Sequence, residues 1–324
     1  MEKQNNKYDV EFFNLLTTEG LIITYGNKIT DTEIKVKKFK ELSENHNIYT
    51  AGLNWDLPNE VKNEKAKQIV NPIYRERILA NWSGITEETK NICRGLKPGQ
   101  TLEEKFLSLE KDEEIYIAIL YWDVSNDAKS EAFKKLKNKK IIYNLLNDYK
   151  GIEYDINDVN KKFLDFKDPF YIIFLGKNKF ISDESKNIKF LETNDESLAM
   201  EMYEKWDGLT QNNIEKKFLL LKEPEYIYRA GVNWKLTDEV KNKKFLSLWD
   251  KEKNCFYDEY YTFLCGTEWE GLTNKNKNEI FIKFKEEYVI QYAWMWWTGI
   301  TEKSKKLQLE RLKCLKRDQK CAYL

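Results

Sequence analysis

Few side chains in this sequence could support catalysis. His46 is the only histidine, so no second imidazole can share a metal ion or a proton with it. The cysteines form no CxxC pair, and their odd number argues against a disulfide framework. The five are Cys93, Cys255, Cys265, Cys314 and Cys321. We therefore expect reduced thiols, no metal site and no cofactor.

Adjacent carboxylates are the remaining candidates for catalysis. General acid–base chemistry uses such groups, and they occur as Glu87–Glu88, Glu113–Glu114 and Glu286–Glu287. Each pair stands at the expected start of a helix or in a turn, where the helix dipole and solvent favour negative charge. The chain contains no nucleophile elbow, phosphate-binding loop, dinucleotide fingerprint or zinc-protease motif. We expect a non-catalytic protein without a small-molecule substrate.

Aromatic residues are abundant, and most of them follow an internal repeat. Residues 48–67 and 227–246 share 12 of 20 residues at an offset of 179. A shorter pattern, tryptophan–x–glycine–apolar–threonine, starts at four tryptophans, namely Trp82, Trp206, Trp269 and Trp297. Self-similarity at a fixed period is the signature of a repeat protein.

The repeat places an anchor position every 27 to 30 residues along most of the chain. The anchors are Asn27, Trp55, Trp82, Trp122, Tyr149, Lys179, Trp206, Trp234, Trp269 and Trp297. Two longer steps, of 40 residues after Trp82 and 35 after Trp234, indicate insertions near 91–101 and 249–263. Sixteen residues before seven of the ten anchors stands a phenylalanine. They are Phe39, Phe106, Phe133, Phe163, Phe190, Phe218 and Phe281, and Phe245 is the expected displaced equivalent for Trp269.

Each unit is predicted to contain two short helices. Apolar residues at the anchor and four and seven positions before it, as in Ile227, Ala230 and Trp234, lie on one helical face. After the anchor, a turn and a threonine or serine predict the N-cap of a second helix. Helices this short are marginal in water and must stack on their neighbours. We therefore predict an all-α, right-handed-type α-solenoid of about ten helix–turn–helix repeats of 27–30 residues.

An α+β fold is the alternative. Three segments, near 21–25, 115–122 and 171–176, are rich in β-branched and aromatic residues, which favour strands. Their register with the clear helices argues for helix instead.

The predicted array covers residues 1–299. The segment near 91–101 is the expected hinge or insertion, and 249–263 is the second insertion. Residues 300–324 are basic, with leucines at helical spacing, and predict a C-terminal capping helix over the last exposed face.

Composition restricts location and partners. Lys+Arg and Asp+Glu both number 54, so the net charge is zero, which is not typical of a general polyanion binder. The N-terminus resembles no signal peptide, and no apolar run approaches the roughly 18 residues that span a bilayer. We expect a cytoplasmic protein that does not bind membranes. Abundant Lys, Asn, Ile and Glu favour an AT-rich bacterial or mobile-element origin.

Three tryptophans fall outside the repeat and are the candidates for binding. Trp249 lies in the second insertion with Tyr257 and Tyr260, while Trp294 and Trp296 flank the apolar stripe of the last full unit. Aromatic rings that stacking does not require are typical of protein-binding surfaces. The leading hypothesis is thus a protein that binds or sequesters a protein partner, as an inhibitor, an immunity-like protein or a scaffold. Burial of these rings by the capping helix and the insertion is the competing interpretation.

Two other functions remain open. The basic tail, including Lys313, Lys316 and Arg317, predicts nucleic-acid contact if it forms a stripe with lysine-rich helix faces. The second alternative is an enzyme with a carboxylate site in the concave groove, formed by distant repeats.

Overall fold

The chain folds as a helical repeat protein, as predicted. The computed structural model describes residue 13 and residues 16–148, 153–250 and 252–321, with side chains of the last helix described as far as Lys313. Within these ranges the only strands are the two-residue β1 (Trp249–Asp250) and β2 (Cys255–Phe256), which pair antiparallel. All other regular elements in these ranges are helices.

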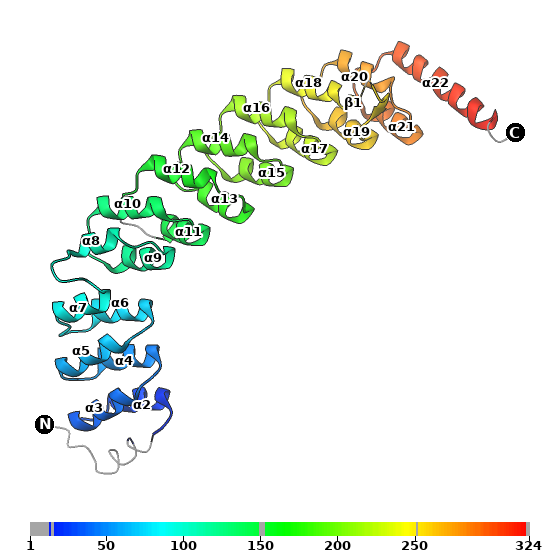
Figure 1. Ribbon diagram of the computed structural model, residues 1–324. Coiled ribbons are helices and arrows are strands. Elements are labelled where there is room, and N and C mark those ends of the chain that lie inside the picture. Colours follow the sequence, from blue (N-terminus) through cyan, green and yellow to red (C-terminus); the bar gives the residue numbers. More distant parts are fainter. Residues whose placement is uncertain (1–12, 14–15, 149–152, 251, 322–324) are drawn as a thin grey trace. The chain divides into compact units, whose positions relative to one another are not determined.

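Two kinds of helix alternate along the chain (Figure 1). The first kind ends at or near an anchor position and is called an anchor helix. The anchor helices are α2 (Glu19–Gly26), α4 (Asn45–Asn54), α6 (Pro72–Asn81), α9 (Asp112–Tyr121), α11 (Lys139–Asp148), α13 (Pro169–Gly176), α15 (Glu196–Lys205), α17 (Pro224–Asn233), α19 (Glu259–Glu268) and α21 (Glu287–Trp296). The second kind follows the anchor and is called a return helix. The return helices are α3 (Thr32–Glu41), α5 (Asn59–Gln68), α7 (Glu87–Arg94), α8 (Leu102–Leu107), α10 (Asn126–Lys135), α12 (Ile156–Leu164), α14 (Asp183–Glu192), α16 (Gln211–Leu220), α18 (Asp238–Ser247), α20 (Asn274–Phe281) and α22 (Glu302–Cys321).

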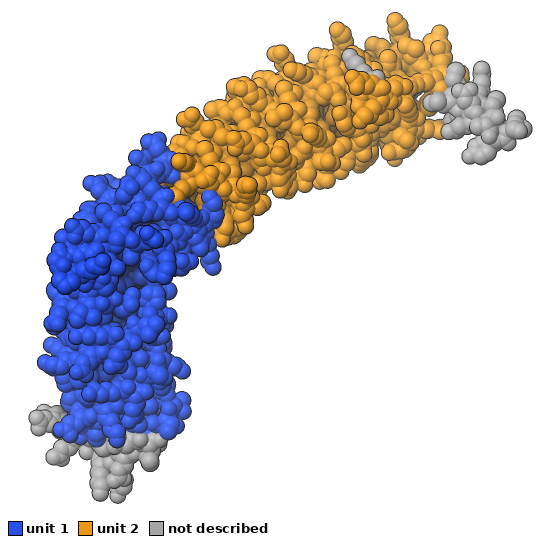
Figure 2. Space-filling model, viewed as in Figure 1, with its two compact units in different colours: residues 1–158 blue, residues 159–324 orange. Residues whose placement is uncertain are grey.

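The chain divides into two compact units, residues 1–158 and 159–324 (Figure 2). Within each unit the anchor helices pack on one another in one row, as α4 does on α6 and α19 on α21. The return helices form a second row beside them, as α16 does with α14 and α18.

The three segments considered as strands are helices. They fall in α2, α9 and α13, so the α+β alternative is wrong. Their β-branched side chains are buried, for example Ile22, Ile115 and Ile172. Packing in the row therefore overrides the local preference for extended backbone.

Anchor tryptophans connect one repeat to the next through a glycine. A Cβ on Gly231 of α17 would lie 2.0 Å from the Trp269 indole, so only glycine leaves room for the ring. The Trp269 Nε1 group donates a hydrogen bond to the backbone oxygen of Tyr228, 3.2 Å away on the same helix. The same arrangement recurs for the pairs Gly52–Trp82, Gly176–Trp206 and Gly266–Trp297. Each of these indoles is therefore both packed and hydrogen-bonded against the preceding anchor helix, and the space beside each glycine is called a tryptophan slot.

Three phenylalanines of the return row, Phe39, Phe218 and Phe245, lie between successive anchor tryptophans. The Phe245 ring centroid is 6.3 Å from that of Trp269 and 5.8 Å from that of Trp297. Phe39 bridges Trp55 and Trp82 in the same way. All seven phenylalanines that define the repeat, and Phe245, are fully buried. Phe245 therefore has the position expected for the displaced equivalent before Trp269.

Asparagines tie four of the return helices to the following turn. The Asn187 side-chain amide donates to the backbone oxygens of Asp183 and Gly208, at 2.6 and 2.8 Å, and its oxygen accepts from the Thr210 backbone N–H at 2.9 Å. Gly208 has a φ of 82°, which explains the glycine in this turn. Equivalent bonds join Asn63, Asn242 and Asn278 to Gly84, Gly271 and Gly299.

Buried lysines connect the return helices. The Lys244 ammonium on α18 donates to the backbone oxygens of Leu219 and Leu221 at the end of α16. These carbonyls have no partner within their own helix, and the C-terminal end of a helix attracts a cation. Lysines at equivalent positions, Lys65, Lys189 and Lys217, make the same pairs of bonds.

Both predicted insertions have defined structures. The longer step after Trp82 contains two return helices, α7 and α8, joined by residues 95–101. The step after Trp234 contains the β1–β2 hairpin. At the chain's other end, α22 packs on α20, and the side chains of Gln308 and Arg311 donate to the backbone oxygens of Phe284 and Ile282.

We predict that Gly231→Ala destabilises the second unit by about 1–3 kcal/mol, because the new methyl group overlaps the Trp269 indole. Thermal unfolding followed by circular dichroism measures this. Gly20→Ala is the control: a Cβ there has no atom within 4 Å, so its transition is expected to match or exceed that of the parent. Equal thermal transition temperatures for the two variants would contradict the close packing of Trp269 against Gly231.

A second prediction concerns pH. Burial lowers the pKa of Lys244 from 10.5 to about 8. Between these values the unfolded chain holds a proton that the folded chain has released, so folding becomes more favourable as pH rises. The stability of the parent relative to Lys244→Met should therefore increase between pH 8 and 10.5, by on the order of 3 kcal/mol, since one pKa unit corresponds to about 1.4 kcal/mol.

Urea unfolding at several pH values tests this prediction. The exposed neighbour Lys243 supplies the control variant Lys243→Met, whose difference from the parent should not change over this range. A pH-independent difference for Lys244→Met would show that the Lys244 pKa is not lowered by folding.

Candidate binding surface

Four of the five aromatic residues selected from the sequence are exposed. Tyr257 and Trp296 are 59% and 64% exposed, and Tyr260 and Trp294 are 47% and 37% exposed. Tyr257 lies just after the hairpin, Tyr260 lies on α19, and the two tryptophans lie on α21. These rings are accessible to a partner.

Trp249 is different, and the expectation that it forms part of an exposed patch is wrong. It is only 8% exposed, and its ring packs edge-on against Phe256 across the hairpin, with centroids 4.8 Å apart. The ammonium groups of Lys283 and Lys285 lie 5.6 and 5.9 Å from the centre of its ring. Trp249 therefore attaches the hairpin to the return row, as the burial interpretation predicted.

Trp294 occupies the position that glycine has in other anchor helices. It stands three residues before Trp297, as Gly231 stands before Trp234 and Gly266 before Trp269. Its ring packs against Phe281, and Lys305 of α22 lies over it. The position of the slot glycine is thus held by a larger side chain, as it also is at Leu79 and Tyr203.

A groove of about 450 Å³ lies between α21 and α22. Trp294, Met295, Leu309 and Leu312 form much of its lining, with Lys313 at its edge. Lys313 is exposed, whereas the side chains of Lys316 and Arg317 lie outside the described residues.

Sequence reasoning missed most of the tyrosines that surround the selected residues. The Tyr228 ring contacts Tyr261, which contacts Tyr260, with centroids 6.1 and 5.7 Å apart. On the next helix Tyr288 contacts Tyr292 at 6.5 Å, and Trp296 stands one turn further along. These six residues, spread over α17, α19 and α21, are called the aromatic face. A signal was present, because Tyr260 and Tyr288 both stand nine residues before an anchor.

Carboxylate groups surround the tyrosines of the aromatic face. The Tyr228 hydroxyl donates a hydrogen bond to Glu268 at 2.5 Å, and burial together with this carboxylate raises the pKa of Tyr228 to about 12. Burial and the nearby carboxylates also raise the pKa of Tyr261 and Tyr288. The phenols therefore stay neutral and can donate hydrogen bonds. The carboxylates around them belong to Glu225, Asp258, Glu259, Glu268 and Glu286.

The zero net charge hides an unequal distribution within the second unit. Its anchor helices carry seven acidic and two basic side chains: Glu196, Glu201, Glu204, Glu225, Glu259, Glu268 and Glu287, against Lys205 and Arg229. Three lysines of its return helices, Lys189, Lys217 and Lys244, are not available to a ligand, because they cap the carbonyls of the preceding helix. The anchor row of this unit is therefore its acidic side.

No described group of three or more histidine, cysteine or carboxylate side chains could hold a metal ion. Among the described residues, no helix has both the length and the apolar character that crossing a membrane requires. Comparison with known proteins gives no relative: no family model, no curated protein and no solved structure matches this chain. The function must be inferred from the surface itself.

We expect Trp249→Ala to lower the thermal transition of the second unit, by about 3 kcal/mol or more in unfolding free energy, since it empties a buried ring site. Trp296→Ala should change that free energy by less than about 0.5 kcal/mol, because the ring is exposed. Differential scanning calorimetry compares the two. A larger loss at Trp296 than at Trp249 would reverse our assignment of the two rings.

Proposed function

We propose that this protein is a non-catalytic binding protein and that the aromatic face receives a protein partner. The observation that carries the proposal is the aromatic face itself: four of its six rings are exposed on two adjacent anchor helices, and none of the six fills a tryptophan slot. Stacking accounts for the anchor tryptophans and the buried phenylalanines but not for these side chains.

The chemistry of the face suits protein recognition. Tyrosine and tryptophan offer large contact areas with little side-chain freedom to lose, and they dominate binding energy at protein interfaces. The neutral phenols add hydrogen-bond donors at the same surface. An adjacent apolar residue, Met295, is 67% exposed and extends the contact area.

Charge favours a basic partner. Glu225, Glu268 and Glu287 belong to the three helices of the face, where Arg229 is the only basic side chain. Arginine and lysine side chains gain from both carboxylates and aromatic rings. The same charge repels phosphates, so nucleic acid is the weaker candidate for this face.

Sequestration is the form of binding that we propose. A partner docked over three helices is held by a rigid surface without any chemical step, as in an inhibitor or immunity-like protein. A scaffold that joins two partners would use the same face.

Affinity measurement on variants tests the proposal. A protein captured from the source organism's extract would be titrated against the parent and against Tyr292→Ala and Trp296→Ala. Each substitution is expected to weaken binding by about 2 kcal/mol, or roughly thirtyfold. Phe180→Ala is the control, because this ring is 58% exposed in the same unit but lies outside the face.

A salt series with random-sequence RNA distinguishes the alternative. We expect weak binding to RNA. Tight binding that falls steeply with salt and is unaffected by Trp296→Ala would favour a nucleic-acid partner and contradict the proposal.

A further inference from the structure

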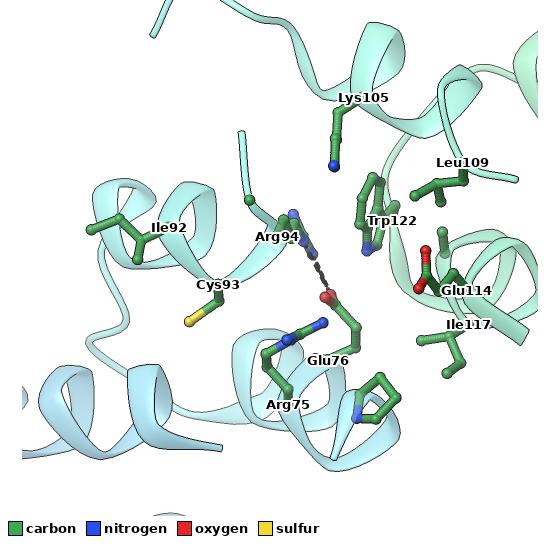
Figure 3. Close-up of a pocket in the computed structure, with 13 residues that line it drawn as sticks. Arg75, Glu76, Ile92, Cys93, Arg94, Lys105, Leu109, Glu114, Ile117 and Trp122 are labelled. Carbon is green, nitrogen blue, oxygen red and sulfur yellow. Dashed lines mark hydrogen bonds and ion pairs between the residues drawn. The ribbon is translucent and has the colours of Figure 1, made fainter. Parts of the chain in front are cut away.

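The first unit contains a cavity where its return row is interrupted. The 40-residue step after Trp82 places two return helices, α7 and α8, beside the adjacent anchor helices α6 and α9. α7 packs on α5, whereas α8 packs on α10. Between them, residues of α6, α7, α8 and α9 line a cavity of about 260 Å³ that is open to solvent (Figure 3).

Positive groups outnumber negative groups among the charged side chains that line the cavity. Arg75, Arg94 and Lys105 line it together with Glu76 and Glu114. Two of these five groups neutralise each other: the Arg94 guanidinium binds the Glu76 carboxylate at 3.0 Å, and Glu76 is only 2% exposed. Figure 3 shows this pair at the centre of the cavity, with Lys105 directed toward it from another helix.

The remaining carboxylate is also paired. Glu114 lies at the edge and binds the exposed ammonium of Lys111 at 3.2 Å. Neither Arg75 nor Lys105 forms an ion pair within the described part of the chain, and the Arg75 Nε group is buried without a hydrogen-bond partner. Two cationic side chains of the cavity are therefore uncompensated.

A neutral donor is left unpaired at the same place. Trp122 is 6% exposed, its indole lines the cavity, and its Nε1 group has no acceptor. Four other anchor tryptophans donate to the preceding anchor helix. For Trp122 the position of the slot glycine is held by Leu79, and Arg94 lies over the ring at 5.3 Å.

Two more anchor tryptophans, Trp55 and Trp234, also leave Nε1 without an acceptor. Their indoles are packed instead: Trp55 fills the slot at Gly26, and Trp234 stacks on Tyr203 with centroids 5.0 Å apart. Trp122 differs because its unpaired N–H belongs to a ring that borders a cavity shared with two uncompensated cations.

Burying the Arg75 Nε and Trp122 Nε1 donors without partners is unfavourable, and an anion in the cavity would accept from both while pairing with the half-buried Lys105 ammonium. We propose that this cavity is a binding site for a small anionic molecule, held through a carboxylate or phosphate group by Arg75 and Lys105, with Trp122 Nε1–H as a third donor. Ile92, Leu109 and Ile117 line the rest of the cavity and would pack against a compact apolar part of the ligand.

The site is suited to binding and not to covalent chemistry. Cys93 also lines the cavity, but burial raises the pKa of its thiol, so the reactive thiolate is disfavoured. A bound anion would contact α6, α8 and α9 together. It would therefore reinforce the first unit where the return row is interrupted.

Titration of the full-length protein with inorganic phosphate and, separately, with acetate tests the site. Both titrations are run at constant ionic strength, and the indole N–H signals are followed by ¹⁵N-correlated NMR. The Trp122 signal is assigned with Trp122→Phe. We expect a saturable shift of the Trp122 signal with at least one anion, and the anion that causes it identifies the ligand's acidic group.

Variants locate the effect. Lys105→Gln should weaken the response about tenfold or more, as expected for the loss of one charge-assisted hydrogen bond. Arg75→Gln provides a second variant should either one alter folding, which circular dichroism would reveal. Lys97→Gln removes the same charge from an exposed position on the neighbouring loop and should respond like the parent. No shift with either anion, or the same shift in every variant, would overturn the proposal.

Discussion

The packing of an anchor tryptophan on the preceding anchor helix, into a glycine slot at five of the described junctions, is the constraint on which the array depends. Helices of about ten residues have little stability of their own, so each must gain it from a neighbour. The indole supplies buried area and a hydrogen bond, while the glycine permits the approach of two helices. Phenylalanines between successive tryptophans, asparagines at the turns and lysines at the helix ends then fix the spacing between repeats. All of these contacts connect neighbours, which is why the repeat is visible in the sequence.

Sequence alone predicted the parts of the fold that rest on apolar spacing. Tryptophan and phenylalanine at fixed offsets gave the two helices of each unit, and both predicted insertions have defined structures. The bonds made by Asn187 and Lys244 were missed, because a polar residue on a helix shows no sign in the sequence of which backbone group it will reach. The strand-like segments misled in isolation, since burial in the row decides their structure.

The candidate surface was predicted only in part, for the same reason. Departure from the repeat correctly indicated Tyr260 and Trp296 as exposed, but it did not separate them from Trp249, which packs in the hairpin. Exposure depends on what an insertion folds against. Two kinds of site result from these departures. The aromatic face uses rings beyond those that stacking needs, whereas the cavity beside Trp122 exists because an extra helix interrupts the return row.

Hydrogen exchange of the intact protein, measured by mass spectrometry under native conditions, tests most directly whether each repeat depends on its neighbours for stability. If stacking supplies the stability, the interior helices α15, α16, α17 and α18 should open together, with a shared free energy of exchange across both rows. Separate and unrelated opening free energies for these four helices would contradict the account, because they would show that each helix is stable without the contacts that join it to the next.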